Sequence, residues 1–597
     1  MKIKLLCFFS LLLPLLLNAN VTIGKWRVFF APKDKLTAEQ VCNSSRNGIL
    51  PAGAVEFTLK NNLRNLKDIR GYYHFGKEAA LVHTTITARE KCKVRIGTGC
   101  DWFMSVFCNG KMVMSNEPDG STVYTSHTEM DYQLTLDLNA GTNHLSFRLR
   151  PGSASWDFAF ALAPSPANWP KETDGRRGFF QRLFPDAERT FYIFPYISDI
   201  TPDSVRLSME FSDEEAVQLR YRKMGSNKWL LHAPELREGL ISRKKLHHFE
   251  LKNLVPASRY ECIIEVLAQK YGAKPVEIQR CVFNTLPDRG MKHSVIITGD
   301  TQVRPYICRE AVIATCKTAP DAAMFIHLGD VQHSIKNPVR DFFRNIVDAV
   351  NVNYAEKIKN NPETPLLPAI LLRGNHDFRG KYSEYYTRYF RKAYRAFRIG
   401  DVFYIILDTG EMIPECRQKN AVTYYNDFTE YFKQQRKWLE EVIASPECRT
   451  AKRRIVLAHA TPLANEKHFR KSIEKITGNA FFGENPKCKI DLWIAGHVHT
   501  AYRYHPANNT LHGLNVPWLR HLLNPEKQFL KGINFPFYVN DGPGGEITLS
   551  SLELKHDPDG MEIICRDIPS GKVLDHVRLE DNKPFIVKKS VFVEHKW

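Results

Sequence analysis

Short apolar runs alternate with turn residues over residues 20–165. Runs such as LVHTTITA, CKVRIGTG and WDFAFALA have the length and the β-branched and aromatic content of strands. The dipeptides Asn109-Gly110 and Ala140-Gly141 fall between such runs and indicate tight hairpin turns. Several short strands at this spacing predict an all-β sandwich.

A second group of β-like runs covers residues 192–288. It follows a stretch rich in proline, glycine and charge within residues 166–191, and such a composition is typical of a linker. The clearest runs are VQLRYRKMGSNKWL, YECIIEVL and QRCVFNTLP. They predict a second all-β sandwich, separated from the first by the linker.

The pattern changes over residues 291–597, where buried strands alternate with helices. SVIITG, AMFIHLG, AILLRG, VFYIILD, RIVLAH and DLWIAG are short and fully apolar, as strands covered on both faces are. Between them, DFFRNIVDAVNVNYAEKI and FTEYFKQQRKWLEEVI read as helices. This alternation predicts an α/β domain. The β-like runs ITLSSLEL and MEIICRDI then predict a C-terminal β extension.

The first 19 residues have a different pattern from the rest of the chain. Lys2 and Lys4 precede the apolar run LLCFFSLLLPLLL, and the small residue Ala19 follows it. This order is that of a secretory signal peptide, and the run is too short to span a membrane comfortably. We therefore expect an exported protein (periplasmic, at the cell surface or secreted) without a transmembrane segment in the mature chain. A membrane anchor is the alternative.

Composition and charge narrow the classes of partner. Of the 597 residues, 43% are hydrophobic and 25% charged, as in ordinary globular proteins. The formal net charge is +18, and loss of Lys2 and Lys4 with the signal peptide leaves +16. A basic protein favours anionic substrates. Because the charge is spread along the chain without an arginine-rich arm, no specific nucleic-acid binding is predicted.

The cysteine count agrees with export. Of 13 cysteines, Cys7 would leave with the signal peptide, so an even number would remain in an oxidising compartment. Cys262 and Cys281 lie on two strand-like runs whose midpoint is Tyr271-Gly272, so a hairpin there would place them opposite each other. A disulfide between them is one hypothesis, and two buried free thiols are the other.

Groups that can bind metals follow five of the apolar strands directly. They are Asp300, Asp330 with His333, Asn375-His376-Asp377, His459, and His497 with His499. Sites in α/β sheets lie at the carboxyl ends of strands. A glycine stands immediately before the polar residues in four of these segments, at positions 299, 329, 374 and 496. Glycine allows the backbone to bend sharply or to approach a ligand closely. Carboxylate, amide and imidazole groups together predict a site for divalent metals.

The order GD, GDxxH, GNHD, H and GHxH, from Thr298 to Asp541, resembles the calcineurin-like metallophosphoesterases. The resemblance implies a four-layer αββα domain with two metal ions. It implies that Asp330 bridges both ions, with Asn375, His459 and His497 at one ion and Asp300 and His499 at the other. Members of this family hydrolyse phosphate esters by attack of a metal-bound hydroxide.

One position departs from the family pattern. Where most members have Asp-x-His, this chain has Asp300-Thr301-Gln302. Gln302 is a possible but poor ligand. His333 stands where purple acid phosphatases carry a metal-binding tyrosine, and we expect it to supply the missing imidazole. Without a phenolate the enzyme would be colourless or pale, and the mixed oxygen and nitrogen ligands leave iron, manganese and zinc open.

The resemblance also implies residues that act on the substrate. His376 would lie near the leaving group as a catalytic proton donor or hydrogen-bond donor, and Asp377 would orient it. Arg373 could bind the phosphate, or it could be a surface charge. Asn375 would contact the substrate as well as the metal.

The two β-rich segments carry weaker resemblances. DWFMSVFCNGKMV and LNAGTNHLSFRL resemble jelly-roll, galactose-binding-like modules, and LKNLVPASRYE resembles the tyrosine corner of fibronectin III-like domains, which precede the catalytic domain in purple acid phosphatases. We therefore favour a phosphomonoesterase. The alternatives are a phosphodiesterase or nuclease, and a non-catalytic surface protein that binds a glycan through the N-terminal domain.

Overall fold

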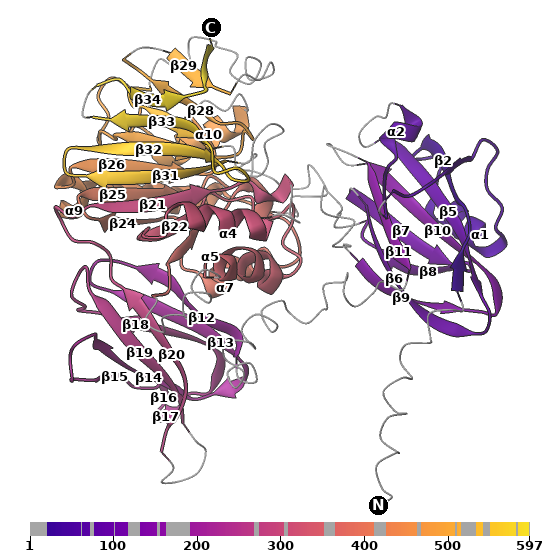
Figure 1. Cartoon of the computed structure of the whole chain (residues 1–597), viewed down its shortest axis with the longest axis horizontal. Helices are drawn as coiled ribbons and strands as arrows, with labels where there is room; N and C mark the ends of the chain where they lie inside the picture. Colours follow the sequence, from indigo (N-terminus) through magenta and orange to yellow (C-terminus); the bar gives the residue numbers. More distant parts are fainter. Residues whose placement is uncertain are drawn as a thin grey trace, which may run out of the picture. The chain divides into compact units, whose positions relative to one another are not determined.

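The protein is described by a computed structural model that divides it into two compact units, Met1–Lys171 and Glu172–Trp597 (Figure 1). The structure describes residues 21–595 except 61, 72–76, 101, 118–131, 152–155, 163–190, 268–273, 304–307, 352–364, 411–425, 463–466, 508–509, 515–532, 541–549 and 581–582. The expected signal peptide and most of the expected linker lie outside the described residues. No helix in these ranges is long and apolar enough to cross a membrane.

The first unit is a sandwich of two antiparallel sheets, as its pattern of short strands predicts. The larger sheet contains β1 (Val21–Ile23), β2 (Trp26–Pro32), β3 (Val55–Phe57), β5 (Glu78–Ala88), β7 (Trp102–Cys108), β8 (Lys111–Ser115) and β10 (Gly141–Pro151). The smaller contains β4 (Leu63–Asn65), β6 (Cys92–Cys100), β9 (Tyr132–Leu138) and β11 (Asp157–Leu162). Helices α1 (Ala38–Asn47) and α2 (Lys67–Arg70) complete the unit. Buried aromatic rings from both sheets, including Trp26, Phe147 and Phe158, pack together between them.

One of the two predicted hairpin turns of this unit is confirmed. Asn109 and Gly110 connect β7 to β8 with φ angles of 51° and 78°, which is the left-handed pair that a two-residue turn requires. The hairpin predicted at Ala140-Gly141 is wrong, because β9 pairs with β6 of the smaller sheet and β10 pairs with β5 and β7 of the larger one. In this connection between the sheets, the buried side chain of Asn143 donates to the Asn139 carbonyl and accepts from its N–H, both at 2.8 Å. The first turn therefore joins two paired strands, whereas Asn143 fixes a crossing from one sheet to the other.

The second unit begins with another two-sheet sandwich. One sheet contains β12 (Phe191–Ile200), β13 (Val205–Glu215) and β18 (Lys244–Leu251). The other contains β14 (Val217–Lys223), β15 (Leu230–His232), β19 (Arg259–Val266) and β20 (Val276–Asn284), and a separate hairpin is made of β16 (Leu236–Arg237) and β17 (Leu240–Ile241). At the predicted corner, the Val255 N–H donates to the buried Tyr260 hydroxyl at 2.9 Å. Cys262 and Cys281 are direct cross-strand partners, and the structure holds both as free thiols.

The remainder of the second unit contains two large mixed sheets. The first has the order β23 (Ala369–Leu371), β22 (Met324–His327), β21 (His293–Thr298), β31 (Ser550–Asp557), β32 (Gly560–Asp567), β33 (Val573–Leu579) and β34 (Ile586–Ser590). The second has the order β24 (Arg395–Ile399), β25 (Val402–Leu407), β26 (Arg453–Ala458), β27 (Leu492–Ala495), β30 (Phe537–Val539), β28 (Tyr502–His505), β29 (Thr510–Gly513) and β35 (Val593–His595).

Helical segments accompany both sheets. They are η3 (Thr301–Val303), α4 (Cys308–Thr318), η5 (Val339–Val347), α5 (Asp348–Val350), η6 (Asn375–Phe378), α7 (Tyr385–Tyr389), α8 (Thr429–Ala444), α9 (Pro446–Arg449) and α10 (Lys467–Thr477). The helix predicted from FTEYFKQQRKWLEEVI is confirmed as α8. The one predicted from DFFRNIVDAVNVNYAEKI is described only as far as α5, and η5 is a π-helix rather than an α-helix.

The strand pattern explains the layers. In β21, Val295 and Ile297 join the core that contains the second sheet, whereas Ile296 between them packs with Val312 of α4 and Phe342 of η5. Because side chains alternate between the two faces of a strand, one face of the first sheet meets the second sheet and the other meets helices. The predicted multidomain architecture, with all-β sandwiches before an αββα domain, is confirmed.

Candidate metal centre

The residues expected to bind metals lie beyond the carboxyl ends of parallel strands from both large sheets. β21, β22 and β23 belong to one sheet, and β26 and β27 belong to the other. The segments after these strands carry Asp300, Asp330, Asn375, His459, His497 and His499. A continuous chain of polar contacts connects all six side chains.

The backbone at four of these six residues is left-handed. The φ angles are 53° at Asp300, 56° at Asp330, 73° at His497 and 56° at His499. This region costs a non-glycine residue roughly 1–3 kcal/mol and is most often retained at functional sites. The loops therefore hold these side chains at a local energetic cost.

Glycines leave the room that the acidic residues occupy. A Cβ atom on Gly374 would lie 2.1 Å from Asp330 Oδ1, and one on Gly496 would lie 2.3 Å from Asp300 Oδ2. Gly329 has a φ of 100°, and a Cβ there would meet the backbone N of Gly374 at 2.3 Å. The glycines noted in the sequence are thus needed by the packing of the centre itself.

Asp330, Asn375, His459 and His497 form the first donor group. His459 Nε2 lies 3.4 Å from Asp330 Oδ2, 3.2 Å from Asn375 Oδ1 and 3.2 Å from His497 Nδ1. One ligand atom each from Asp330, His459 and His497 falls within 4.8 Å of the others. His459 Nδ1 lies 3.0 Å from the carbonyl oxygen of Leu328 and must donate to it, which leaves Nε2 as the free lone pair that a metal needs.

Asp300, Gln302 and His499 form the second donor group, beside Asp330. The Gln302 amide nitrogen donates to Asp330 Oδ2 at 3.0 Å and lies 3.0 Å from His499 Nε2, which is 3.7 Å from Asp300 Oδ1. Asp300 Oδ2 and Gln302 Oε1 are buried and have no hydrogen-bond partner among the described residues. Such atoms normally have partners, so a cation in contact with them fits the donor set.

Crowded carboxylates dominate the electrostatics. Burial, together with the neighbouring Asp330 carboxylate, raises the pKa of Asp300 to about 8. Burial opposes the charged form of His459, but the surrounding Asp330 and Asp300 carboxylates outweigh it and raise its pKa to about 9. Buried acids repel one another unless positive charge separates them. The cluster therefore favours cations, as the residue types in the sequence indicate.

His333, His376 and Arg379 form a hydrogen-bonded group beside the two donor groups. His376 Nδ1 lies 2.9 Å from Arg379 Nη1 and 3.1 Å from His333 Nδ1. Arginine can only donate, so His376 Nδ1 accepts from Arg379. A neutral His376 with Nδ1 as an acceptor carries its proton on Nε2.

The side chain of Asp377 accepts hydrogen bonds from backbone N–H groups and not from any histidine that the structure describes. Its carboxylate accepts from the N–H groups of Asp330, Val331 and Gly374 at 2.7, 3.0 and 2.8 Å. Among the described residues, Asp377 makes no hydrogen bond to His376, so the expected orienting contact is replaced by one that fixes the Asp330 loop.

The side chain of Arg373 is only 11% exposed and contacts protein groups. Its Nε and Nη2 atoms donate to Asp408 Oδ2 at 2.9 and 2.6 Å, and Nη2 also donates to the Tyr431 hydroxyl at 3.0 Å. The guanidinium stands over the Phe378 ring at 4.3 Å. The reading of Arg373 as a surface charge is wrong, and its contacts are those of a structural ion pair.

Two residues of the site had no assignment from the sequence. Arg379 follows the GNHD motif, but an arginine after a motif has no spacing rule that would single it out. Asp408 directly follows the apolar run VFYIIL, as the predicted ligands follow their strands. That signal could have marked Asp408 as a residue at the same edge, although its partner is Arg373.

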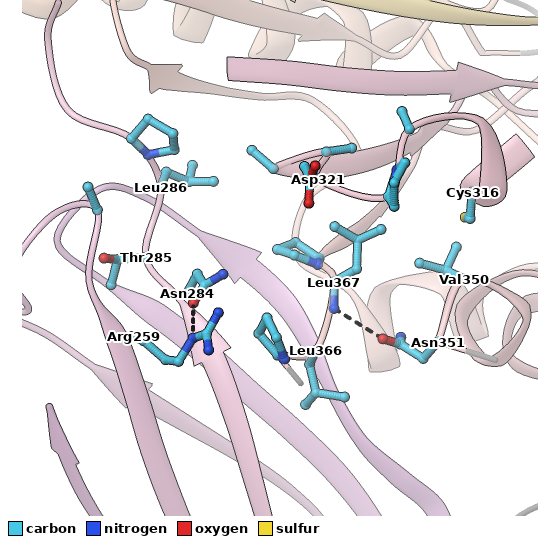
Figure 2. A pocket seen from close by; sticks show the side chains of 18 of the residues that line it. Arg259, Asn284, Thr285, Leu286, Cys316, Asp321, Val350, Asn351, Leu366 and Leu367 are labelled. Carbon is cyan, nitrogen blue, oxygen red and sulfur yellow. Dashed lines mark hydrogen bonds between the residues drawn. The ribbon is translucent and has the colours of Figure 1, made fainter. Parts of the chain in front are cut away.

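A separate cavity of about 700 Å³ lies where the second sandwich meets the remainder of the second unit (Figure 2). Figure 2 shows Arg259 and Asn284 on one side, and Asp321, Leu367 and Asn351 on the other. It shares no residue with the metal-binding candidates.

Residues 293–501 match the family model of the calcineurin-like phosphoesterases. This part of the chain is therefore a calcineurin-like phosphoesterase domain, and it places the protein among the metal-dependent phosphoester hydrolases. The matched range contains every residue predicted to bind metal.

Several solved structures match this chain. Purple acid phosphatase PPD1 from yellow lupin (Lupinus luteus) seeds is 13% identical, covers 85% of this chain and 93% of its own, and gives a TM-score of 0.45. PhoD is 12% identical over 68% of this chain and 93% of its own, with a TM-score of 0.41. GAP50, the anchor in the inner membrane complex of Plasmodium, is 10% identical over 50% of this chain and 90% of its own, with a TM-score of 0.31. No curated protein matches the chain.

Proposed function

We propose that the protein is an exported phosphoesterase that uses two metal ions and favours phosphate monoesters. The position of Asp330 carries this proposal. Its carboxylate lies beside His459 of the first donor group and Gln302 of the second, and it also accepts from the His376 N–H at 2.9 Å. A carboxylate shared in this way suits a ligand that bridges two ions.

The residues of this chain would bind the metals as two neighbouring sets. Asp330, Asn375, His459 and His497 would hold one ion, and Asp300, Asp330, His499 and His333 would hold the other, with Gln302 as a further possible ligand. Iron, manganese and zinc all suit these ligand types. Bound there, the ions would neutralise phosphate charge and lower the pKa of a coordinated water, so that hydroxide is available at neutral pH.

His376 would act on the leaving group. The hydrogen bond from Arg379 holds its Nδ1 as an acceptor, so its Nε2–H can donate to the ester oxygen as the bond to phosphorus breaks. Asp377 keeps the Asp330 and Gly374 segments together and so positions His376, which follows Asn375 in η6. Arg373 would support the same strand end through Asp408.

Hydrolysis assays test the proposal directly. We expect the purified protein to cleave para-nitrophenyl phosphate faster than its bis-ester when manganese, zinc or iron is supplied. His333→Ala should lose metal, measured by elemental analysis, together with activity. His376→Gln should keep the metal and lose activity, because it removes the proton donor without removing a ligand.

His576→Ala serves as the matched control, because this histidine lies on β33 outside the metal centre with a side chain that is 27% exposed, and it should behave as wild type. A wild-type protein that binds no metal and cleaves neither ester would overturn the proposal. Faster cleavage of the bis-ester would make the enzyme a phosphodiesterase. If His333→Ala retained its metal, Gln302 rather than His333 would be the ligand that replaces the family's histidine.

Export rests on the pattern of residues 1–19. Expression of the full chain in a secreting host, followed by N-terminal sequencing, should give a mature protein that begins at Asn20. A protein that retains Met1 in the cytoplasmic fraction would contradict export and would leave the phosphoesterase proposal untouched.

A further inference from the structure

The β16–β17 hairpin exposes a group of large aliphatic side chains. In this hairpin and the neighbouring strand β15, the exposed fractions are 74% at Leu240, 61% at Leu236, 58% at Leu231, 49% at Ile241 and 41% at Leu230. Single exposed aliphatic residues are ordinary, but three of the six residues from Leu236 to Ile241 are exposed aliphatic ones, and such a group on one hairpin indicates a binding surface.

The hairpin is a well-defined structure rather than a loose loop. Leu236 pairs with Ile241 and Arg237 pairs with Leu240, and the Ser242 N–H donates to the Glu235 carbonyl at 2.8 Å. Glu238 and Gly239 form the turn with φ angles of 51° and 84°. This left-handed pair is the geometry of a tight two-residue hairpin turn, so the tip is presented in a fixed shape.

Apolar side chains project from both faces of this tip. Cross-strand partners share a face, so Leu236 and Ile241 lie on one face and Leu240 lies with Arg237 on the other. A protein partner would cover one face of a narrow hairpin and leave the other in water. A lipid layer surrounds whatever is inserted in it, and it therefore suits a tip that is apolar on both sides.

Basic residues surround the apolar tip. Between positions 228 and 245 the chain has five Lys or Arg residues and two Glu residues. One of the glutamates, Glu235, is paired with Lys244, while Lys228, Arg237 and Arg243 are exposed. Cationic side chains bind anionic lipid headgroups, and neighbouring aliphatic side chains insert among the acyl chains.

The place of the hairpin in the unit agrees with contact to a surface. β16 and β17 lie at the end of the sandwich that points away from the large phosphoesterase sheets (Figure 1). Insertion of the tip would therefore leave the metal centre of the same unit clear of the lipid.

We propose that the β16–β17 hairpin docks the protein on an anionic phospholipid surface, with Leu236, Leu240 and Ile241 inserted and the surrounding Lys and Arg side chains on the headgroups. This inference does not depend on the proposed hydrolytic function.

Vesicle co-sedimentation of the full-length protein tests the inference. We expect binding to vesicles of phosphatidylglycerol and phosphatidylcholine in equal parts, weaker binding at high salt, and little binding to phosphatidylcholine alone. Leu236→Ser/Leu240→Ser/Ile241→Ser should weaken binding more than about tenfold, because each side chain contributes buried apolar area. Arg237→Gln and Arg243→Gln should each weaken it about fivefold, and Glu238→Gln should strengthen it.

The matched control is Ile586→Ser/Val587→Ser on β34, which removes aliphatic side chains exposed to 39% and 52% outside the hairpin. It should bind as wild type, and circular dichroism should show all variants folded. Absence of wild-type binding, or equal binding by the Leu236/Leu240/Ile241 variant, would overturn the inference. A dimer in solution that this variant abolishes would instead assign the hairpin to a second copy of the chain.

Discussion

Gly496 shows how one missing side chain shapes the centre. Its backbone is not left-handed, so alanine would be tolerated there except for the contact of its Cβ with Asp300 Oδ2 at 2.3 Å. We expect Gly496→Ala to displace Asp300 and to lower ester hydrolysis about 10- to 100-fold, as losses next to metal ligands do. Metal content, measured beside the initial rate, should fall toward one ion per chain.

Gly560→Ala provides the steric control for that experiment. Its Cβ would meet Arg578 Nη2 at 2.6 Å, a contact of similar closeness but with a flexible side chain on β33. This variant should retain full activity and metal. If both variants were equally impaired, the loss would reflect general destabilisation, and the argument from Asp300 would fail.

Arg373 and Asp408 give the second prediction at the scale of the residue. The Asp408 side chain is 1% exposed and that of Arg373 is 11% exposed, so Arg373→Met leaves an uncompensated buried carboxylate, which costs about 3–5 kcal/mol. Urea unfolding should show this loss, and Arg373→Met/Asp408→Leu should recover much of it. A variant Arg373→Met with unchanged stability but a raised KM would contradict the structural assignment and restore the phosphate contact expected from the sequence.

Strands β21 and β31 place two histidines opposite each other, at the start of β21 and near the end of β31. His293 and His556 are direct partners with ring centroids 5.0 Å apart. Burial lowers the pKa of His293 to about 3, with a further contribution from His556, and burial together with Arg453 lowers that of His556 to about 4. Above pH 6.5 both rings are neutral in the folded and unfolded chain, so neither changes stability with pH.

Below pH 6.5 the unfolded chain takes up protons that the fold excludes. Stability should therefore fall as the pH drops from 6.5 toward 4, by up to about 1.4 kcal/mol per pH unit for each histidine. Urea titrations of chelator-treated protein should show a smaller slope for His556→Phe. Tyr404→Phe, which removes only the hydroxyl 3.2 Å from His293 Nε2, should keep the wild-type slope. If the unfolding free energy fell with pH at the same rate in all three proteins, His293 and His556 would not contribute to the loss of stability in acid.

The strands of the catalytic domain were predictable because each one is covered on both faces and therefore reads as a continuous apolar run. For this reason the runs SVIITG and RIVLAH correctly predicted strands β21 and β26, and with them the positions of the polar residues that follow each strand. The pairing of β31 with β21 was not predictable, because no local signal in ITLSSLEL names a partner about 250 residues away. The sequence could not predict the contacts of Arg373, Asp377 and Arg379 for the same reason. Each contact depends on a group that only the fold brings close.

At the scale of the whole molecule, the second sandwich and the phosphoesterase domain form one packed body. Apolar residues of the sandwich such as Phe194 and Leu207 belong to the same buried cluster as Val456 of β26. Phe283 and Leu366 form a bridge between the two parts, and the Tyr196 hydroxyl donates to the Tyr389 carbonyl at 2.9 Å. The two domains that the sequence suggests at residues 192–288 and 291–597 therefore share a core.

Glu210 is the polar centre of that junction and supplies the last prediction. This buried carboxylate accepts from Arg388 at 2.8 Å and from the Tyr389 hydroxyl at 3.0 Å. Glu210→Ala should cost about 1.5–3 kcal/mol, since it removes hydrogen bonds to and from a charged group. Calorimetry of the full chain should show one transition for residues 21–171 and one for the second unit, and only the latter should move to lower temperature.

Glu277→Gln, at an exposed pair with Arg280, should shift neither transition, because exposed ion pairs contribute little. A third transition, belonging to the sandwich alone and the only one sensitive to Glu210, would show that the junction does not couple the two parts.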